Sequence, residues 1–429
     1  MKFAAHLILF GILTHIVSAQ VQDMKIGVLS LDRAIALAVE HHPSIRSAEA
    51  SVRSAEAGLT QAIASYLPTI TSTATFSRTQ GAFVLNPDFP PRDQRYNNYS
   101  AVIQANETIF DFGKSISRVS AGGKLVDAAE ADFQSAKSAV VMNVQIAYFV
   151  YVRAKQVAGV NEENVARAEA HLKQAKAFFS VGKRAQIDVT KTEVDLANAE
   201  VNLIRARNEL RVAKLQLDNA MGIHSTEEYL VADSLSIQPL AMDLDSIRTI
   251  ALRQRPELVS ARARVDANQS LVTAAWTQHL PTISAFGRYT WSNFDFPLLS
   301  NWNAGIAFTL PIFQGFATQA QVSQARANAD VAQANLDALS ESALLDVEQN
   351  YLGLKEADER IAATTKLVEL AEANLNISER QYAAGVASAL EVTDAQGTLS
   401  NARITRIQAL FDYNSSLAKL RRAMGVMQY

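Results

Sequence analysis

The chain has 429 residues, of which 48% are hydrophobic, and its formal net charge is −3. A chain of this length forms one large domain or two moderate ones, and the small net charge argues against nucleic acid as a partner. The sequence contains no cysteine, which excludes disulfides and the N-terminal lipid that bacterial lipoproteins carry on cysteine.

The first 19 residues have the features of a secretory signal peptide. They contain one lysine, an apolar run from Leu7 to Val17 and small residues up to Ala19. This pattern predicts cleavage after Ala19 and export of the mature chain. The alternative is a buried N-terminal helix, but the apolar run is short and polar residues follow it directly. The most apolar later segment, 139–152, is shorter than the about 20 residues that a transmembrane helix needs.

Two internal repeats account for the mature sequence. The motif Leu-Pro-Thr-Ile occurs at 67–70 and again at 280–283. Further along, equivalent residues lie 203 positions apart, as Gly182 and Gly385 do. A repeat is sought before a fold is assigned, because each copy should form the same unit. We therefore predict a first repeat at 20–222, a linker at 223–255 and a second repeat at 256–429.

The first repeat should begin with helices and continue with a pair of strands. Ser30 is a capping residue for a short amphipathic helix that ends before Pro43. An alanine-rich helix then runs to Tyr66, where the following Leu-Pro ends it. Threonine, aromatic and β-branched residues dominate the strand pair at 69–110. The predicted strands are 69–78 and 96–110, joined by a loop at 81–95.

A long helical hairpin at 113–221 completes the first repeat. No proline interrupts residues 113–180, and apolar residues recur there at helical spacing. A helix of nearly 70 residues is roughly 100 Å long at about 1.5 Å per residue. The helices at 44–66 and 185–221, stacked end to end, span nearly the same distance. Each repeat should therefore supply two full-length helical columns, one continuous and one composite.

The second repeat is predicted to follow the same order. After a helix it has a strand pair at 282–313, with strands at 282–291 and 302–313, and then a helical hairpin at 315–424. The last strand alternates clearly, since its apolar residues fall on one face. These are Trp302, Ala304, Ile306, Phe308 and Leu310. This repeat is ten residues shorter across its strand pair, and we assign that difference to the loop.

Strands of about ten residues with an apolar face are long enough to cross a bilayer in a tilted barrel. Four strands cannot close, and an open sheet edge is not tolerated in lipid because its backbone amides have no partner there. The chain should therefore associate with copies of itself. Four helical columns would continue below four strands, one column to each strand.

Several motifs together resemble the outer membrane efflux protein family of the TolC type, over essentially the whole mature chain. They are the doubled Leu-Pro-Thr-Ile, the Ile-Phe and glycine after each strand pair, the tip sequences SVGKRAQIDV and AAGVASALEVTDAQ, and the Ala-Met-Gly that closes each repeat. The resemblance implies an all-α protein with a membrane β part. Three chains would form a periplasmic α-barrel continuous with a 12-stranded transmembrane β-barrel in outer-membrane lipid, with the linker in a small equatorial domain.

The resemblance also implies a function and site residues. The homotrimer would be the exit duct of a tripartite efflux or type I secretion system, with a periplasmic adaptor and an inner-membrane transporter as partners. The hairpin tips would dock the adaptor, Glu391 and Asp394 would line the pore constriction, and Tyr382 with Asp188 would keep the tip closed. The tip residues are Val181, Gly182 and Lys183, and Ala384, Gly385 and Val386. A second closing contact is missing, because Ala387 and Ile187 stand where the family has an arginine and its polar partner.

The main alternative is a soluble exported coiled-coil protein with a structural or adaptor role. It accounts for the long helices and the signal peptide but not for apolar-faced strands at the same place in both repeats. An enzyme is not expected, because no nucleophile motif or phosphate-binding loop is present. The histidines are scattered without metal-ligand spacing, so we expect no metal or cofactor. The resemblance implies that the transporter, and not this chain, selects the transported substrate.

Overall fold

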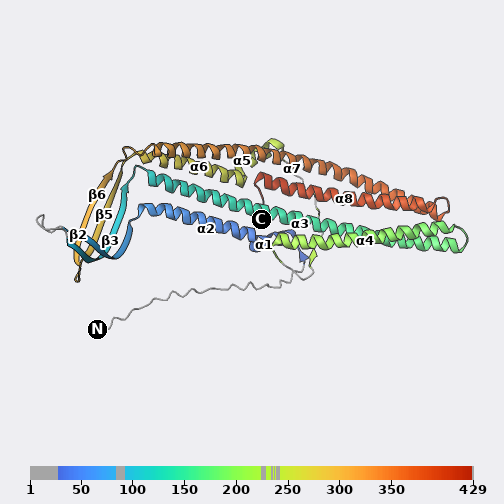
Figure 1. Ribbon diagram of the computed structural model, residues 1–429. Coiled ribbons are helices and arrows are strands. Elements are labelled where there is room, and N and C mark those ends of the chain that lie inside the picture. The colour runs from blue at the N-terminus through green and yellow to red at the C-terminus, as the bar shows by residue number, and fades with distance from the viewer. Residues whose placement is uncertain are drawn as a thin grey trace, which may run out of the picture.

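The computed structural model describes residues 28–83, 92–223, 229–232, 235, 237 and 242–427. The predicted signal peptide lies outside these residues. The described chain is elongated, with a four-stranded sheet at one end and two helix-to-helix turns at the other (Figure 1). Among the described residues, no helix is both long enough and apolar enough to span a membrane.

The eight helices of the described chain form two sets of matching lengths. Each set contains helices of 11, 21, 67 and 36 residues in that order. The first set is α1 (Leu31–His41), α2 (Pro43–Ile63), α3 (Lys114–Ser180) and α4 (Gln186–Met221). The second set is α5 (Leu244–Gln254), α6 (Pro256–Trp276), α7 (Ala317–Ala383) and α8 (Ala389–Met424). An internal duplication predicts these equal helix lengths. A 3₁₀ turn also follows α2 at Ala64–Tyr66, and another follows α6 at Thr277–His279.

Local sequence explains where the shorter helices begin. The side chain of Ser30 accepts a hydrogen bond from the backbone N–H of Arg33, as predicted for the cap of α1. The Asp243 carboxylate caps α5 in the same way, at 3.1 Å from the Ser246 nitrogen. Pro43 and Pro256 occupy the first turn of α2 and α6, where the missing proline N–H leaves no hydrogen bond unmade.

The helices form four parallel columns. Helices α2 and α4 lie end to end along α3, whereas α6 and α8 lie end to end between α3 and α7 (Figure 1). The composite columns predicted from helix length are therefore confirmed. Each column continues into one strand of the sheet, because α2 precedes β2, β3 precedes α3, α6 precedes β5 and β6 precedes α7.

A glycine closes each repeat where the halves of a composite column meet. Gly222 and Gly425 follow α4 and α8 and have φ angles of +68° and +74°. A Cβ on Gly222 would lie 2.9 Å from the Cα of His42, and one on Gly425 would lie 2.7 Å from the carbonyl oxygen of Gln254. Only glycine satisfies both the left-handed backbone and this close approach.

The four long strands form one antiparallel sheet in the order β2-β3-β5-β6. Their bounds are β2 (Thr69–Phe83), β3 (Arg92–Phe110), β5 (Thr282–Asn293) and β6 (Leu299–Thr309). The predicted loop at 81–95 was too long, since pairing continues to Phe83 and Arg92 and the Arg95 side chain donates to Gln80 across the strands. Part of the length difference between the repeats is therefore in the strands. The last strand ends at Thr309 rather than Phe313, because Pro311 has no N–H to continue the ladder.

The two faces of the sheet differ in polarity. By strand register, one face carries large exposed apolar side chains, as the alternation in β6 predicted. They are Ile70, Phe76, Ile103, Trp302, Ile306 and Phe308. The opposite face carries polar side chains, including Thr71, Gln104, Arg288 and Asn303. On that face the Arg288 guanidinium donates to the Gln104 side chain at 2.6 Å.

A second, two-stranded sheet lies beside the middle of the molecule, and the sequence did not predict it. β1 (Val28–Leu29) pairs in parallel with β4 (Leu230–Val231) from the linker. The buried hydroxyl of Tyr148 on α3 donates to the carbonyl of Ala232 at 2.9 Å. This contact fastens the linker to the long helix, within a core that includes Leu29, Val144 and Leu217.

Candidate functional site

The candidate site is the pair of helix turns at the end opposite the large sheet. Gly182 and Gly385 have φ angles of +75° and +84°, which confirms that both turns need a left-handed residue. The N–H of Lys183 donates to the carbonyl of Phe178 at 2.9 Å, and the N–H of Val386 donates to that of Gln381 at 3.0 Å. Both turns therefore end their helix with the same hydrogen-bond pattern.

All six predicted docking residues lie at these turns and are exposed. The two turns differ in chemistry. Each turn exposes a valine, since Val181 is 65% and Val386 79% exposed, but only the first turn adds positive charge, from Lys183 and the partly buried Arg184. A partner that contacts both turns would therefore meet two apolar side chains and a cationic surface on one turn.

Tyr382 lies just behind the turns, in the last turn of α7, and is 1% exposed. Its ring packs edge-on against His171 of α3, with 5.0 Å between ring centroids, and Phe178 lies 5.8 Å away. Burial raises the pKa of Tyr382 and lowers the pKa of His171, because both charged forms lose hydration. The two helical hairpins, α3 with α4 and α7 with α8, therefore meet at the tip through an aromatic cluster of uncharged rings.

The expected contact between Tyr382 and Asp188 is not formed as a hydrogen bond. The Tyr382 hydroxyl has no hydrogen-bond partner among the described residues. Arg184 of the first turn takes the place beside the tyrosine. Its guanidinium lies over the Tyr382 ring at 5.0 Å, and its Nη2 donates to the carbonyl of Ala387 at 2.6 Å. Arg184 was not predicted as a site residue: the Lys-Arg pair after Gly182 shows that the turn is basic but does not indicate which group the arginine contacts.

Glu391 and Asp394 are both exposed on α8, one turn apart. Glu391 also completes a capping box, because its carboxylate accepts from the N–H of Ser388 at 3.1 Å and from the Ser388 hydroxyl at 3.0 Å. These backbone and side-chain hydrogen bonds lower the pKa of Glu391. The first carboxylate is thus held at the helix N-terminus, whereas the carboxylate of Asp394 has no hydrogen bond or ion pair within the described chain.

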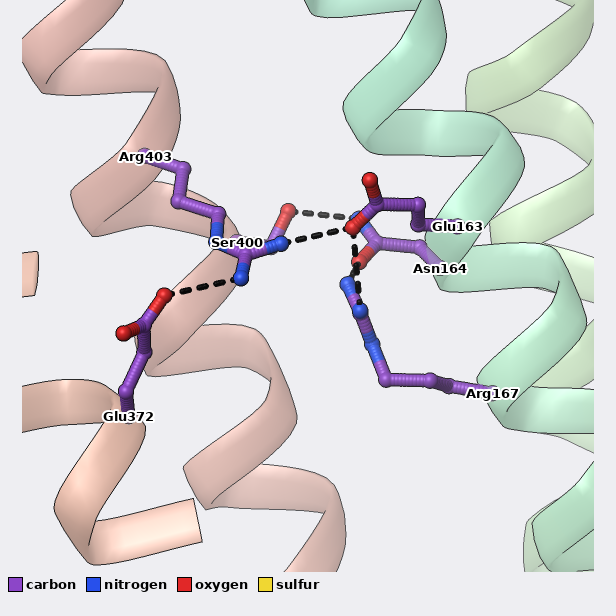
Figure 2. A network of polar contacts seen from close by, with 6 residues as sticks. All are labelled: Glu163, Asn164, Arg167, Glu372, Ser400 and Arg403. Atoms are coloured by element: carbon purple, nitrogen blue, oxygen red, sulfur yellow. Dashed lines mark hydrogen bonds and ion pairs between the residues drawn. The ribbon is translucent and has the colours of Figure 1, made fainter.

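A polar network joins the two hairpins farther from the tip (Figure 2). Arg403 of α8 lies between Glu163 of α3, at 2.6 Å, and Glu372 of α7, at 2.8 Å. Beside it, the Asn164 amide donates to the Ser400 hydroxyl at 2.6 Å. The Glu163–Arg403 and Asn164–Ser400 links join residues more than 200 positions apart, so they set how the first hairpin lies against the second, whereas Glu372 holds Arg403 within the second hairpin.

The arrangement has the geometry of a conduit subunit. Within the described residues, no cluster of histidine and acidic side chains could hold a metal ion. The sheet with one apolar and one polar face, continued by four helical columns, defines a subunit of an outer-membrane duct.

The chain belongs to the outer membrane efflux protein family, which it matches over residues 34–223 and 248–426. It is 24% identical to the outer membrane protein TolC of Escherichia coli, over 77% of this chain and 70% of TolC. It is also 24% identical to the outer membrane efflux protein BepC of Brucella suis, over 93% of this chain and 86% of BepC.

A solved structure has the same fold. The CmeC outer membrane channel of Campylobacter jejuni superposes with a TM-score of 0.81 at 20% identity, over 92% of this chain and 85% of that chain. The resemblance found in the sequence is therefore confirmed. The protein is an outer-membrane exit duct for efflux or secretion.

Proposed function

We propose that three copies of the chain close into one duct, with a 12-stranded barrel in the outer membrane and an α-barrel in the periplasm. The observation that carries this proposal is the large sheet, which has an apolar face, a polar face and two unpaired edges, β2 and β6. In lipid those edges need partners, and a neighbouring chain supplies them when β6 pairs with the next β2. The apolar face then meets lipid and the polar face lines the lumen.

The helical columns support the same arrangement. The outermost columns of one chain contain α4 and α7, and both expose aliphatic side chains along their length. On α4 they include Val194, Val201, Ile204, Val212 and Leu215, and on α7 they include Val331, Leu345, Leu352, Leu370 and Ile377. Pairing of these edges between neighbouring chains would bury them and close the tube of helices.

The site residues take their roles from this assembly. Glu391 and Asp394, contributed by three chains, form acidic rings at the pore constriction. The two turns at 181–183 and 384–386 dock a periplasmic adaptor, which connects the duct to an inner-membrane transporter. The linker at 223–255 forms the equatorial part between the repeats at 20–222 and 256–429, supported by the pairing of β1 with β4. The tip then opens to let substrates pass without chemical change.

Fractionation and mass measurement test the assembly. The mature protein is expected in the outer-membrane fraction, to require detergent for extraction, and to have the mass of a trimer after correction for bound detergent. A stable monomer in the mass measurement would contradict the proposal, because its β2 and β6 edges would have no partner strand. Recovery of the mature protein in the soluble periplasmic fraction would favour the alternative, an exported coiled-coil protein of structural or adaptor type.

A further inference from the structure

The two hairpins of one chain are linked by a short series of polar contacts that ends at the turns. Moving toward the tip, four of them are Glu163 with Arg403, Asn164 with Ser400, Asp195 with Thr393, and Arg184 with Ala387. The last contact is the only one of the four that joins the two turns themselves. It is therefore the contact that a separation of the tips must break first.

Arg184 contacts the opposite turn in two ways. Its Nη2 donates to the backbone carbonyl of Ala387 at 2.6 Å, a charge-assisted hydrogen bond to a main-chain acceptor. The same guanidinium lies 5.0 Å from the centre of the Tyr382 ring. Because Arg184 is only partly exposed and Ala387 is 4% exposed, the hydrogen bond is shielded from full competition with water.

The position of Arg184 in its repeat matches the position of its partner in the other repeat. Arg184 and Ala387 are 203 residues apart and so occupy equivalent places in the two turns. The resemblance placed an arginine at 387, where this chain has alanine. The structure supplies a guanidinium to that same place from the equivalent position of the other repeat.

We propose that Arg184 clamps the two hairpin tips of each chain together and so holds the pore tip closed. The clamp rests on the proposed function, because it regulates the tip of the duct. It replaces a hydrogen bond between Tyr382 and Asp188, since the tyrosine acts through its buried ring and not through its hydroxyl. Release of the Arg184 guanidinium frees the second turn to move away from the first.

Single-channel recording of the purified trimer in planar lipid bilayers, without adaptor, tests the clamp. Arg184→Ala is expected to raise the ratio of open to closed states about tenfold, the factor for one lost charge-assisted hydrogen bond. Arg184→Lys should have an intermediate effect, because lysine keeps the charge but not the planar group that stacks on the ring. The matched control is Arg380→Ala, which removes an exposed arginine from the last turn of α7, at the same end of the molecule as Arg184.

Tyr382→Phe separates the clamp from a tyrosine hydrogen bond. It keeps the ring that Arg184 covers and deletes only a hydroxyl without a partner among the described residues. Its increase in opening should therefore be much smaller than that of Arg184→Ala. An increase equal to or larger than that of Arg184→Ala would overturn the clamp.

A distance measurement checks the tips directly, and the absence of native cysteines makes labelling specific. Spin labels at Lys183→Cys and Ala384→Cys are expected to give longer and broader distances after Arg184→Ala than after Arg380→Ala. If the wild type forms channels while Arg184→Ala gives the same ratio of open to closed states and the same spin-label distances as Arg380→Ala, the proposed clamp is wrong. The proposed duct is not affected in that case. If neither the wild type nor any variant conducts, the proposed duct fails and the clamp fails with it.

Discussion

The glycine that closes the second repeat permits a quantitative test of the column junction. At Gly425 an alanine Cβ would lie 2.7 Å from the carbonyl oxygen of Gln254 and 2.8 Å from the Cα of Arg255. Both neighbours are backbone atoms, so they move only if the junction between α5 and α6 moves. The φ angle of +74° adds a second cost for any residue with a Cβ.

The magnitude follows from these two terms. A left-handed backbone at a non-glycine residue costs about 1–2 kcal/mol. Overpacking against atoms that cannot yield costs about a further 1–3 kcal/mol. Gly425→Ala should therefore destabilise the junction by about 2–5 kcal/mol. Gly385→Ala is the matched control, because it has a φ angle of +84° but no described atom within 4 Å of the added Cβ. It should cost only the backbone term of about 1–2 kcal/mol.

Hydrogen exchange measured by mass spectrometry resolves the two variants locally. Peptides from the end of α8 and the start of α6 should exchange roughly 30 to 5,000 times faster in Gly425→Ala, which corresponds to the full destabilisation of about 2–5 kcal/mol. In Gly385→Ala those peptides should keep the wild-type rate, and only the tip should change. Equal exchange at the junction in both variants would show that the close approach does not hold the composite column together.

Three further predictions concern charge, pH and the linker. Glu391→Gln combined with Asp394→Asn should weaken cation preference in single-channel recordings, and unchanged selectivity would remove these acids from the pore. The lowered pKa of His171 means that its contribution to stability is present above about pH 6.5 and is lost as pH falls below it, despite two nearby carboxylates. The protection factors of the tip amides, which correct for the intrinsic pH dependence of exchange, should therefore fall at acid pH, and His171→Phe should abolish that difference. Tyr148→Phe should weaken the linker sheet by about 1 kcal/mol, seen as faster exchange in β1 and β4.

The helical architecture could be predicted because its signals are local or repeat along the chain. A proline-free stretch with helical periodicity predicted α3 and α7, and Pro68 predicted the end of the second helix. The composite columns followed from length alone, since two shorter helices match one long helix only when they stack. The alternation in the last strand likewise predicted its apolar face, because side chains alternate between the faces of a strand.

The missed features depend on contacts between distant segments. β1 and β4 are two residues each, too short for a periodic pattern, and they exist because Tyr148 and the surrounding core hold the linker against α3. The strands of the first hairpin extend into a segment that reads as loop, because pairing with the opposite strand overrides local propensity. Arg184 was not predicted as a site residue for a related reason. Nothing near it in sequence indicates that its partner is its own counterpart in the other repeat.

The two repeats differ at the turns, where the equivalent positions Arg184 and Ala387 touch. Along the columns they keep equal helix lengths, because each helix must stay in register with its neighbours. At the turns the first repeat has the guanidinium of Arg184, whereas the second has the carbonyl of Ala387 as hydrogen-bond acceptor and the N-cap of α8 at Ser388. Two arginines at these equivalent positions would place like charges together, and two alanines would leave no polar link between the turns. A contact between equivalent positions therefore favours one donor and one acceptor, so a difference between the repeats at a single position is sufficient for the polar link between the two turns.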